Sequence, residues 1–280
     1  MEIEIAFKNA YQKLKNNKIK SASIDSEILL SKAINKSREF IILNSKYNIS
    51  NDEYVRYEEM INQRLRGKPI SYLTGKKFFW KYEFFINEDV LIPRPDSEII
   101  IEEVLRIYKK KKKINFLDIG FGSGSILISI LKERNDFRAT GIDISSGALK
   151  VCKINVNKLC VSNRVKLIKS DIDKFFIGKY DLIISNPPYI KKLDLKYLDK
   201  DIINFEPEIA LNGGLDGISE IRKVINKSSE LIKIGGKLIL EIAFDQKNEV
   251  IKLLKERGFF INKTSKDLAK NDRCIISTKT

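Results

Sequence analysis

Short apolar runs alternate with helix-like segments along the second half of this 280-residue chain. The runs at residues 114–119, 138–144, 165–168 and 181–185 have the length and the side chains of buried strands. Helical patterns fill the stretches between them, and this alternation is typical of a parallel sheet. The sequence therefore predicts an α/β fold.

The run at 181–185 stops abruptly at Asn186-Pro187-Pro188-Tyr189. The two prolines fix φ and remove two backbone donors, so we expect a stiff loop. Ligands of open α/β sheets bind beyond the carboxyl ends of the strands, which is where this loop falls. The loop is therefore a candidate binding site, and a proline-rich turn after a strand is the plain alternative.

The residue types of this loop suit a planar NH2 group. The side-chain oxygen of Asn186 and the backbone carbonyl of Pro187 can accept its two hydrogens, and Tyr189 can stack on its plane. Holding both hydrogens while the nitrogen becomes tetrahedral stabilises the transition state more than the ground state. We therefore predict that Asn186 and Pro187 are catalytic, and that Asn186, Pro187, Pro188 and Tyr189 bind the substrate.

A glycine-rich turn, Gly120-Phe121-Gly122-Ser123-Gly124, follows the first of the four strands. Glycines let a ligand approach the backbone closely. Asp143 follows Gly124 by 19 residues, the distance expected for an acid that accepts both hydroxyls of a ribose. Dinucleotide dehydrogenases and methyltransferases share these features. The G-x-G-x-G spacing and Asp118, which can hold a methionine ammonium, favour S-adenosylmethionine.

A further acid, Asp171, follows the strand at 165–168 and is placed for an adenine NH2 group. For Asp143 and Asp171 the alternative is a helix cap or a solvated turn. A nucleoside cofactor would lie beside the substrate nitrogen that the Asn-Pro-Pro-Tyr loop holds. This arrangement indicates methyl transfer that depends on proximity and alignment. The chain has no histidine, which excludes His-based triads, His general bases and His-ligated metals. Methyl transfer needs no metal, and we predict no metal site.

The first 95 residues have a different pattern. Residues 1–70 predict a small helical domain, with helices near 3–14, 24–34, 37–44 and 51–66. Residues 71–95 are aromatic and strand-like, which predicts a β-hairpin that links this domain to a second one at 96–280. Asp96 or Ser97 is expected to cap the helix that follows.

The net charge of +15 suggests a polyanionic partner such as nucleic acid. Lys, Ile and Asn are abundant throughout, however, which a genome-wide A/T bias also produces. We interpret the basic run at 109–113 as a solvated helix end and loop, and an association with the ribosome stays open. The acidic N-terminus, the lack of a membrane-length apolar run and three cysteines without C-x-x-C spacing predict a cytoplasmic protein without a membrane partner.

Several segments together resemble the PrmC/HemK family, the release factor glutamine methyltransferases, nearly from end to end. The matching segments are R-G-K-P-I with Y-L-T-G at 66–75, L-I-P-R-P-D-S-E at 91–98, the cofactor loop at 117–124, the Asn-Pro-Pro-Tyr motif, E-P with A-L and G-G-x-D-G at 206–217, and D-L-A with D-R at 267–273. Asn-Pro-Pro-Tyr alone is shared with DNA adenine methyltransferases, and the other segments are more specific.

The resemblance implies a class I, Rossmann-like, S-adenosylmethionine-dependent methyltransferase domain with a helical N-terminal domain that helps to dock the substrate. It implies N5-methylation of the glutamine in the Gly-Gly-Gln motif of peptide chain release factors. By position, the cofactor would be bound by Gly120, Phe121, Gly122, Ser123, Gly124, Asp143, Asp171, Ile172 and Asn186. Two residues depart from the family pattern: Ile172 stands where Trp is usual, and Ala243 stands where Gly is usual in an E-x-G-x-x-Q segment.

Two other substrates remain as alternatives. An adenine-N6 methyltransferase acting on nucleic acid fits the charge, but residues 1–70 are too few and insufficiently basic for a target-recognition region, so we expect no specific DNA binding. A glutamine methyltransferase acting on a ribosomal protein fits the chemistry. A non-catalytic binding module is disfavoured because both halves of the site are intact.

Overall fold

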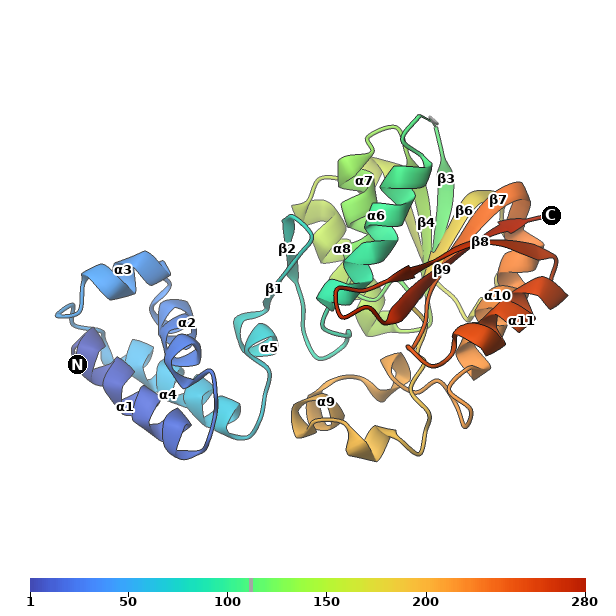
Figure 1. Ribbon diagram of the computed structural model, residues 1–280. Helices are drawn as coiled ribbons and strands as arrows, with labels where there is room; N and C mark the ends of the chain where they lie inside the picture. The colour runs from blue at the N-terminus through green and yellow to red at the C-terminus, as the bar shows by residue number, and fades with distance from the viewer. Residues whose placement is uncertain (111–112) are drawn as a thin grey trace. The chain divides into compact units, whose positions relative to one another are not determined.

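The computed structural model describes residues 1–110 and 113–280 in two compact units (Figure 1). The basic run at 109–113 includes Lys111 and Lys112, which lie outside the described residues. The first unit joins Met1–Lys76 to Asp199–Phe205. The second joins Lys77–Leu198 to Glu206–Thr280.

The first unit is helical, as predicted. Its consecutive helices are α1 (Ile3–Asn16), α2 (Ala22–Ile34), α3 (Arg38–Leu43), α4 (Asn51–Leu65) and the short α5 (Ile70–Thr74), which the sequence pattern did not indicate. The face of α1 that is buried carries Ile3, Ala6, Ala10 and Leu14, spaced as on one side of a helix. A capping box between Ser50 and Glu53 begins α4. Apolar side chains from α1, α2 and α4 form a core of their own.

A segment from far along the chain also belongs to this first unit. The helix α9 (Lys200–Phe205) lies within the stretch at 190–215 and belongs to this unit. Nε of Arg64 donates to Asp25 at 2.8 Å, and its Nη1 donates to Asp201 at 3.2 Å. The Asp25 and Arg64 side chains are largely buried, so this pair satisfies charges that would be costly to leave unpaired.

The second unit contains a seven-stranded sheet in the order β5-β4-β3-β6-β7-β9-β8. The strands are β3 (Asn115–Ile119), β4 (Arg138–Asp143), β5 (Val165–Lys169), β6 (Tyr180–Ser185), β7 (Ile232–Glu241), β8 (Phe259–Lys266) and β9 (Asp272–Lys279). Neighbouring strands from β5 to β7 pair in parallel, and β9 pairs antiparallel with both β7 and β8. The predicted α/β fold is therefore confirmed.

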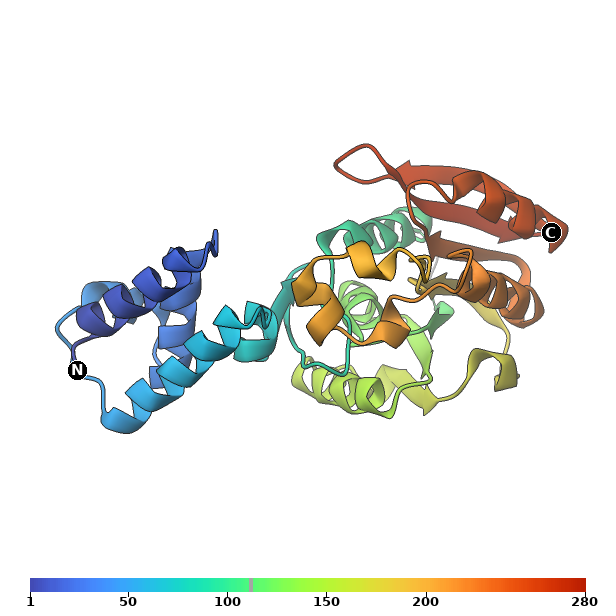
Figure 2. The same cartoon turned by 90° about the horizontal axis from the view of Figure 1, so that it is seen from below.

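Helices cover both faces of this sheet (Figures 1 and 2). One face carries α6 (Glu98–Ile107), α7 (Ser125–Glu133) and α8 (Ser146–Lys158), and the other carries α10 (Ser219–Leu231) and α11 (Lys247–Glu256). Leu182, Ile183 and Ile184 of β6 are fully buried between them. Because β3, β4 and β6 run in parallel, the loops after these three strands meet at one edge of the sheet.

A hairpin of β1 (Lys76–Phe79) and β2 (Tyr82–Phe85) precedes the sheet, as the aromatic pattern predicted. Asn155 of α8 holds it by accepting from the Phe85 N–H at 2.7 Å and donating to the Phe85 carbonyl at 2.9 Å. The same Asn155 amide donates to the Ser123 carbonyl at 2.9 Å. One buried side chain therefore connects the hairpin to the glycine-rich turn.

The start of β7 is irregular. Gly235 and Gly236 lie within this strand, which begins at Ile232. Pairing with β6 shifts register between Tyr180 and Leu182, because Gly235 has φ of +77° and interrupts the regular ladder.

None of the helices in the described part of the chain combines the length and the apolar composition needed to cross a bilayer.

Candidate active site

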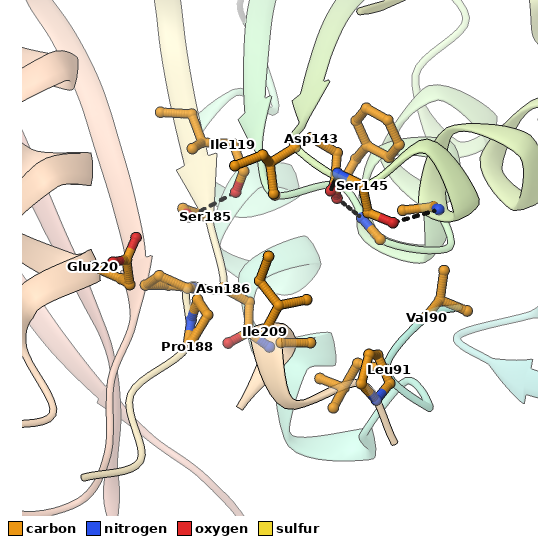
Figure 3. Close-up of a pocket in the computed structure, with 18 of the residues that line it drawn as sticks. Val90, Leu91, Ile119, Asp143, Ser145, Ser185, Asn186, Pro188, Ile209 and Glu220 are labelled. Atoms are coloured by element: carbon orange, nitrogen blue, oxygen red, sulfur yellow. Dashed lines mark hydrogen bonds between the residues drawn. The ribbon is translucent and has the colours of Figure 1, made fainter. Parts of the chain in front are cut away.

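A cavity of about 940 Å³ opens at the carboxyl ends of β3, β4 and β6 in the second unit. Its wall includes the glycine-rich turn, the ends of β4 and β6, and the segment that precedes α6. Figure 3 shows Asp143 on one side of this cavity and Asn186 with Pro188 on the other. The volume is in the range of small-molecule and cofactor sites.

The glycine-rich turn approaches this cavity with bare backbone. Gly120, Gly122 and Gly124 have φ of +77°, +53° and +79°, conformations that side chains with a Cβ rarely adopt. A Cβ at Gly120 or Gly122 would meet no atom within 4 Å, whereas a Cβ at Gly124 would lie 2.5 Å from Sγ of Cys152. The first two glycines therefore leave room for a ligand, and Gly124 packs the start of α7 against α8.

Asp143 ends β4 and lines the cavity. Its Oδ2 accepts from the Gly122 N–H at 2.9 Å and its Oδ1 accepts from the Ser145 N–H at 2.9 Å (Figure 3). Burial raises the pKa of Asp143 above its ordinary value, although these backbone hydrogen bonds favour the ionised form. Each carboxylate oxygen keeps a second lone pair, so the group can still accept hydroxyls.

Asp118 lies one strand away, on β3, and only 2% of its surface is exposed. Burial and, less strongly, the negative charge of Asp143 raise the pKa of Asp118 from 3.8 to about 8. The carboxyl group is therefore mostly protonated at neutral pH.

Asp171 and Ile172 line the cavity after β5. The Asp171 side chain accepts from the Asp173 N–H at 3.0 Å and caps the 3₁₀ turn η3 (Ile172–Lys174). Asp171 therefore forms the cap that the sequence offered as the alternative to a cofactor contact. The contact of Asp171 with adenine stays a prediction. Ile172 packs its partly buried side chain against the apolar core.

The Asn-Pro-Pro-Tyr loop is held at the end of β6. The Ser185 hydroxyl donates to the Ile119 carbonyl at 2.7 Å, and Nδ2 of Asn186 donates to Oγ of Ser97 at 3.0 Å. Asn186, Pro187 and Pro188 line the cavity. With Nδ2 bound to Ser97, Oδ1 of Asn186 is the amide atom that remains to accept an N–H from a ligand.

Tyr189 is fastened at two points. Its hydroxyl donates to Oε1 of Glu241 at 3.4 Å, and its backbone carbonyl accepts from Nε2 of Gln246 at 3.0 Å. Its ring packs against the core, and it is not among the residues that line the cavity in the described part of the chain. Stacking of Tyr189 on a substrate therefore stays a prediction.

One prediction for this region is wrong. Neither Asp96 nor Ser97 forms a side-chain cap on α6. The Ser97 hydroxyl lies against Asn186 instead, because the chain enters α6 through the 3₁₀ turn η1 (Pro95–Ser97) at the edge of the cavity.

Ser97, Glu241 and Gln246 are site residues that reasoning from the residues alone did not identify. Glu241 ends β7, and Gln246 precedes α11, so both reach the loop from a strand and a turn far along the chain. Their positions within the segments that resemble the PrmC/HemK family were the only signal.

Two family models match the chain. The model described as "PrmC N-terminal domain" matches residues 6–75, and the model described as "Methyltransferase small domain" matches residues 97–215.

Among known proteins, the chain is similar to the release factor glutamine methyltransferase of Clostridium acetobutylicum, with 37% identity over 100% of this chain and 99% of that protein. It is 38% identical to the release factor glutamine methyltransferase of Clostridium botulinum over 96% of each chain.

Solved structures share the fold at low identity. A methyltransferase from Pyrococcus furiosus has a TM-score of 0.52 and 18% identity, and covers 70% of this chain and 88% of its own. A ribosomal protein L11 methylase from Lactobacillus delbrueckii subsp. bulgaricus has a TM-score of 0.51 and 16% identity, over 67% of this chain and 80% of its own.

Proposed function

Because the chain belongs to the release factor glutamine methyltransferase family, we propose that it methylates N5 of the glutamine in the Gly-Gly-Gln motif of peptide chain release factors. It is an S-adenosylmethionine-dependent protein-glutamine methyltransferase. Among the features of the site, the amide of Asn186 is the observation that best supports this proposal. Its Nδ2 is bound to Ser97, which leaves Oδ1 to accept one N–H of a substrate amide at the cavity.

The residues at the glycine-rich turn fit S-adenosylmethionine. Gly120 and Gly122 leave open space beside the backbone, and Asp143 keeps lone pairs for the ribose hydroxyls. Asp171 and Ile172 are assigned to the adenine. Asp118 is assigned to the methionine ammonium, whose positive charge would favour the ionised form of this carboxyl group. When bound, the cofactor supplies an electrophilic methyl group on a sulfonium sulfur.

The residues at the end of β6 act on the substrate. Oδ1 of Asn186 and the carbonyl of Pro187 each accept one hydrogen of the glutamine amide. This grip orients the nitrogen toward the methyl donor and strengthens as the nitrogen becomes tetrahedral. The methylated nitrogen then loses one proton to solvent, so no strong base is required.

The helical first unit is assigned to docking the intact release factor, because residues 6–75 match the N-terminal domain of this family, which the resemblance assigns to holding the substrate. We also propose a cytoplasmic location, because the proposed substrate acts in translation termination.

The test offers tritiated S-adenosylmethionine and the purified protein to three acceptors: a full-length release factor, a ribosomal fraction and duplex DNA. We expect label in the release factor alone, and none after its motif Gln is changed to Glu, because the acceptor nitrogen is lost. Label in adenine, falling steeply as salt rises, would instead identify a nucleic-acid enzyme. Label in a ribosomal protein alone would identify the other alternative.

A substitution of Asn186 tests the same assignment from the side of the enzyme. Asn186→Ala should lower the rate of methyl transfer by about 10²-fold or more, as loss of one preorganised polar contact does elsewhere. Binding of S-adenosylmethionine, measured by calorimetry, controls for the fold. A fully active Ala variant contradicts the assigned role of Asn186.

A further inference from the structure

The side-chain amide of Gln246 is buried beside the end of the Asn-Pro-Pro-Tyr loop. Gln246 is 6% exposed and precedes α11. Its Oε1 accepts from the Ala243 N–H at 3.0 Å. Its Nε2 donates to the Tyr189 carbonyl at 3.0 Å and to the Gly217 carbonyl at 2.9 Å. One amide therefore joins the loop after β6 and the chain before α10 to the turn after β7.

Glutamine matches these three partners in a way that side chains of similar size do not. The two carbonyls require two donors and the Ala243 N–H requires an acceptor, and a neutral amide supplies both. A carboxylate of the same shape would place acceptors against the two carbonyls. A methionine would fill similar space and leave all three backbone groups without a partner. The three partners therefore determine both the identity and the orientation of the Gln246 amide.

Gln246 holds one particular peptide group. The Tyr189 carbonyl and the Ile190 N–H belong to the same planar peptide unit. Gln246 binds the carbonyl edge of this unit, and the N–H edge donates to the Leu211 carbonyl at 3.1 Å. Gly213 packs so closely that a Cβ there would lie 2.9 Å from the carbonyl carbon of Tyr189. The peptide group is thus held at both edges and enclosed on the side of Gly213.

The two prolines transmit this restraint along the loop. The other end of the loop is held at Asn186, whose Nδ2 donates to Oγ of Ser97 at 3.0 Å. Between the two ends, Pro187 and Pro188 have fixed φ, and ψ of Pro187 is restricted because a proline follows it. Few dihedral angles remain free, so the orientation of the Pro187 carbonyl depends on where the Tyr189 peptide group is held.

We propose that Gln246 is a positioning residue for methyl transfer. By holding the Tyr189 peptide group, it keeps the Pro187 carbonyl in the orientation that accepts a substrate N–H. The proposal rests on the proposed function of the loop. Asn186, Pro187 and Pro188 line the cavity, whereas Gln246 is not among the lining residues in the described part of the chain. Gln246 therefore acts through the loop and does not touch the substrate.

The first test observes the held peptide group and requires no methyl acceptor. In the wild-type protein, the Ile190 N–H should exchange slowly with water, as measured by NMR hydrogen exchange. Gln246→Met and Gln246→Glu should each speed this exchange by about tenfold relative to the amides of β3. The reason is that loss of one hydrogen bond frees the opposite edge of the same peptide unit. Unchanged exchange of Ile190 in Gln246→Met overturns the proposal.

A control variant in the same helix separates positioning from loss of stability. Val250 is fully buried one turn into α11, so Val250→Ala should destabilise the second unit and keep every hydrogen bond of the Gln246 amide. Its Ile190 exchange relative to β3, and its kcat, should match those of the wild type. If Val250→Ala speeds the exchange as Gln246→Met does, the effect comes from general weakening and the proposal is wrong.

The kinetic test uses a release factor as substrate, at a temperature at which every variant is folded. Gln246→Met should lower kcat by about tenfold, less than loss of Asn186 itself, with KM and S-adenosylmethionine affinity unchanged. Gln246→Glu should lower kcat further, because its carboxylate opposes two carbonyls. A raised KM with wild-type kcat, or wild-type kcat in both variants, overturns the proposal. A wild-type enzyme that labels no release factor refutes the proposed function instead, and the exchange experiment still decides whether Gln246 holds the loop.

Discussion

At the scale of single residues, Asp118 and Asp143 show how two carboxyl groups on neighbouring strands can favour different protonation states. Asp143 ends β4 and receives two backbone N–H donors, which favour its ionised form. Asp118 lies on β3, where burial and the negative charge of Asp143 raise its pKa and favour its neutral form. The cavity is therefore lined by one carboxylate with lone pairs left for hydroxyls, and the buried acid on the neighbouring strand is held mainly in its neutral form.

Replacing Asp143 tests its assignment to the ribose. Asp143→Ala should weaken S-adenosylmethionine binding by at least about tenfold, because charge-assisted hydrogen bonds contribute roughly 1.5–3 kcal/mol. Asp143→Asn keeps one acceptor oxygen and should fall between the wild type and Asp143→Ala. Calorimetry provides the affinities, and equal affinities for Asp143→Ala and the wild type would remove Asp143 from the site.

Asp118 should make stability depend on pH. Its folded pKa of about 8 lies above the ordinary value of 3.8, so the folded state holds a proton that the unfolded state releases. Stability should therefore decline as pH rises from about 4 to about 8. Asp118→Asn should remove this contribution, so its melting temperature relative to wild type should be higher at pH 8.5 than at pH 5. A difference that does not vary with pH contradicts the raised pKa.

At the scale of elements, the glycine-rich turn shows how a strand can lead into a helix and leave space for a ligand beside the backbone. All three glycines adopt positive φ, and they differ in what surrounds them. Gly122 has open space where a Cβ would be, whereas Gly124 is enclosed by Cys152 and Ile128. The turn thus has a ligand-facing part and a packing part.

A matched pair of substitutions separates these parts. Both Gly122→Ala and Gly124→Ala incur the positive-φ cost of about 1–2 kcal/mol. Gly124→Ala also places a Cβ 2.5 Å from Sγ of Cys152, so overpacking should cost about 1–3 kcal/mol more. Denaturant unfolding should rank Gly124→Ala as less stable, and Cys152→Ala should partly restore it. Equal stabilities would contradict the packing role of Gly124.

At the scale of the whole molecule, the chain builds two separate cores. Leu29 is fully buried in the helical first unit, and Leu238 is fully buried in the second. The first unit also includes α9, which is supplied by the chain between β6 and α10. Stability of the helical unit and cofactor binding in the second unit should therefore be separable.

Leu29→Ala and Leu238→Ala provide that separation. Each should destabilise its own unit by about 2–5 kcal/mol. Leu29→Ala should lower methylation of an intact release factor on warming while S-adenosylmethionine binding persists, whereas Leu238→Ala should weaken both. Scanning calorimetry and ligand titration provide the measurements. Loss of cofactor binding in Leu29→Ala would contradict independent units.

The sequence by itself determined the features that depend on local patterning. Alternating strand and helix periodicity predicted the α/β fold, and the positions of Asn186, Asp143 and the glycines followed from turns at strand ends. These features are readable because a parallel sheet brings consecutive strand ends to one edge. The helices of the first unit could also be predicted, because each carries its own apolar face.

Only the tertiary structure decided how distant side chains meet. Ser97 proved to be a partner of Asn186 and not a helix cap, and Glu241 reached the same loop from β7. Asp201 paired with Arg64 across more than a hundred residues of chain, which placed α9 in the helical unit. Such contacts depend on the relative placement of whole elements, and local residue patterns contain no information about that placement.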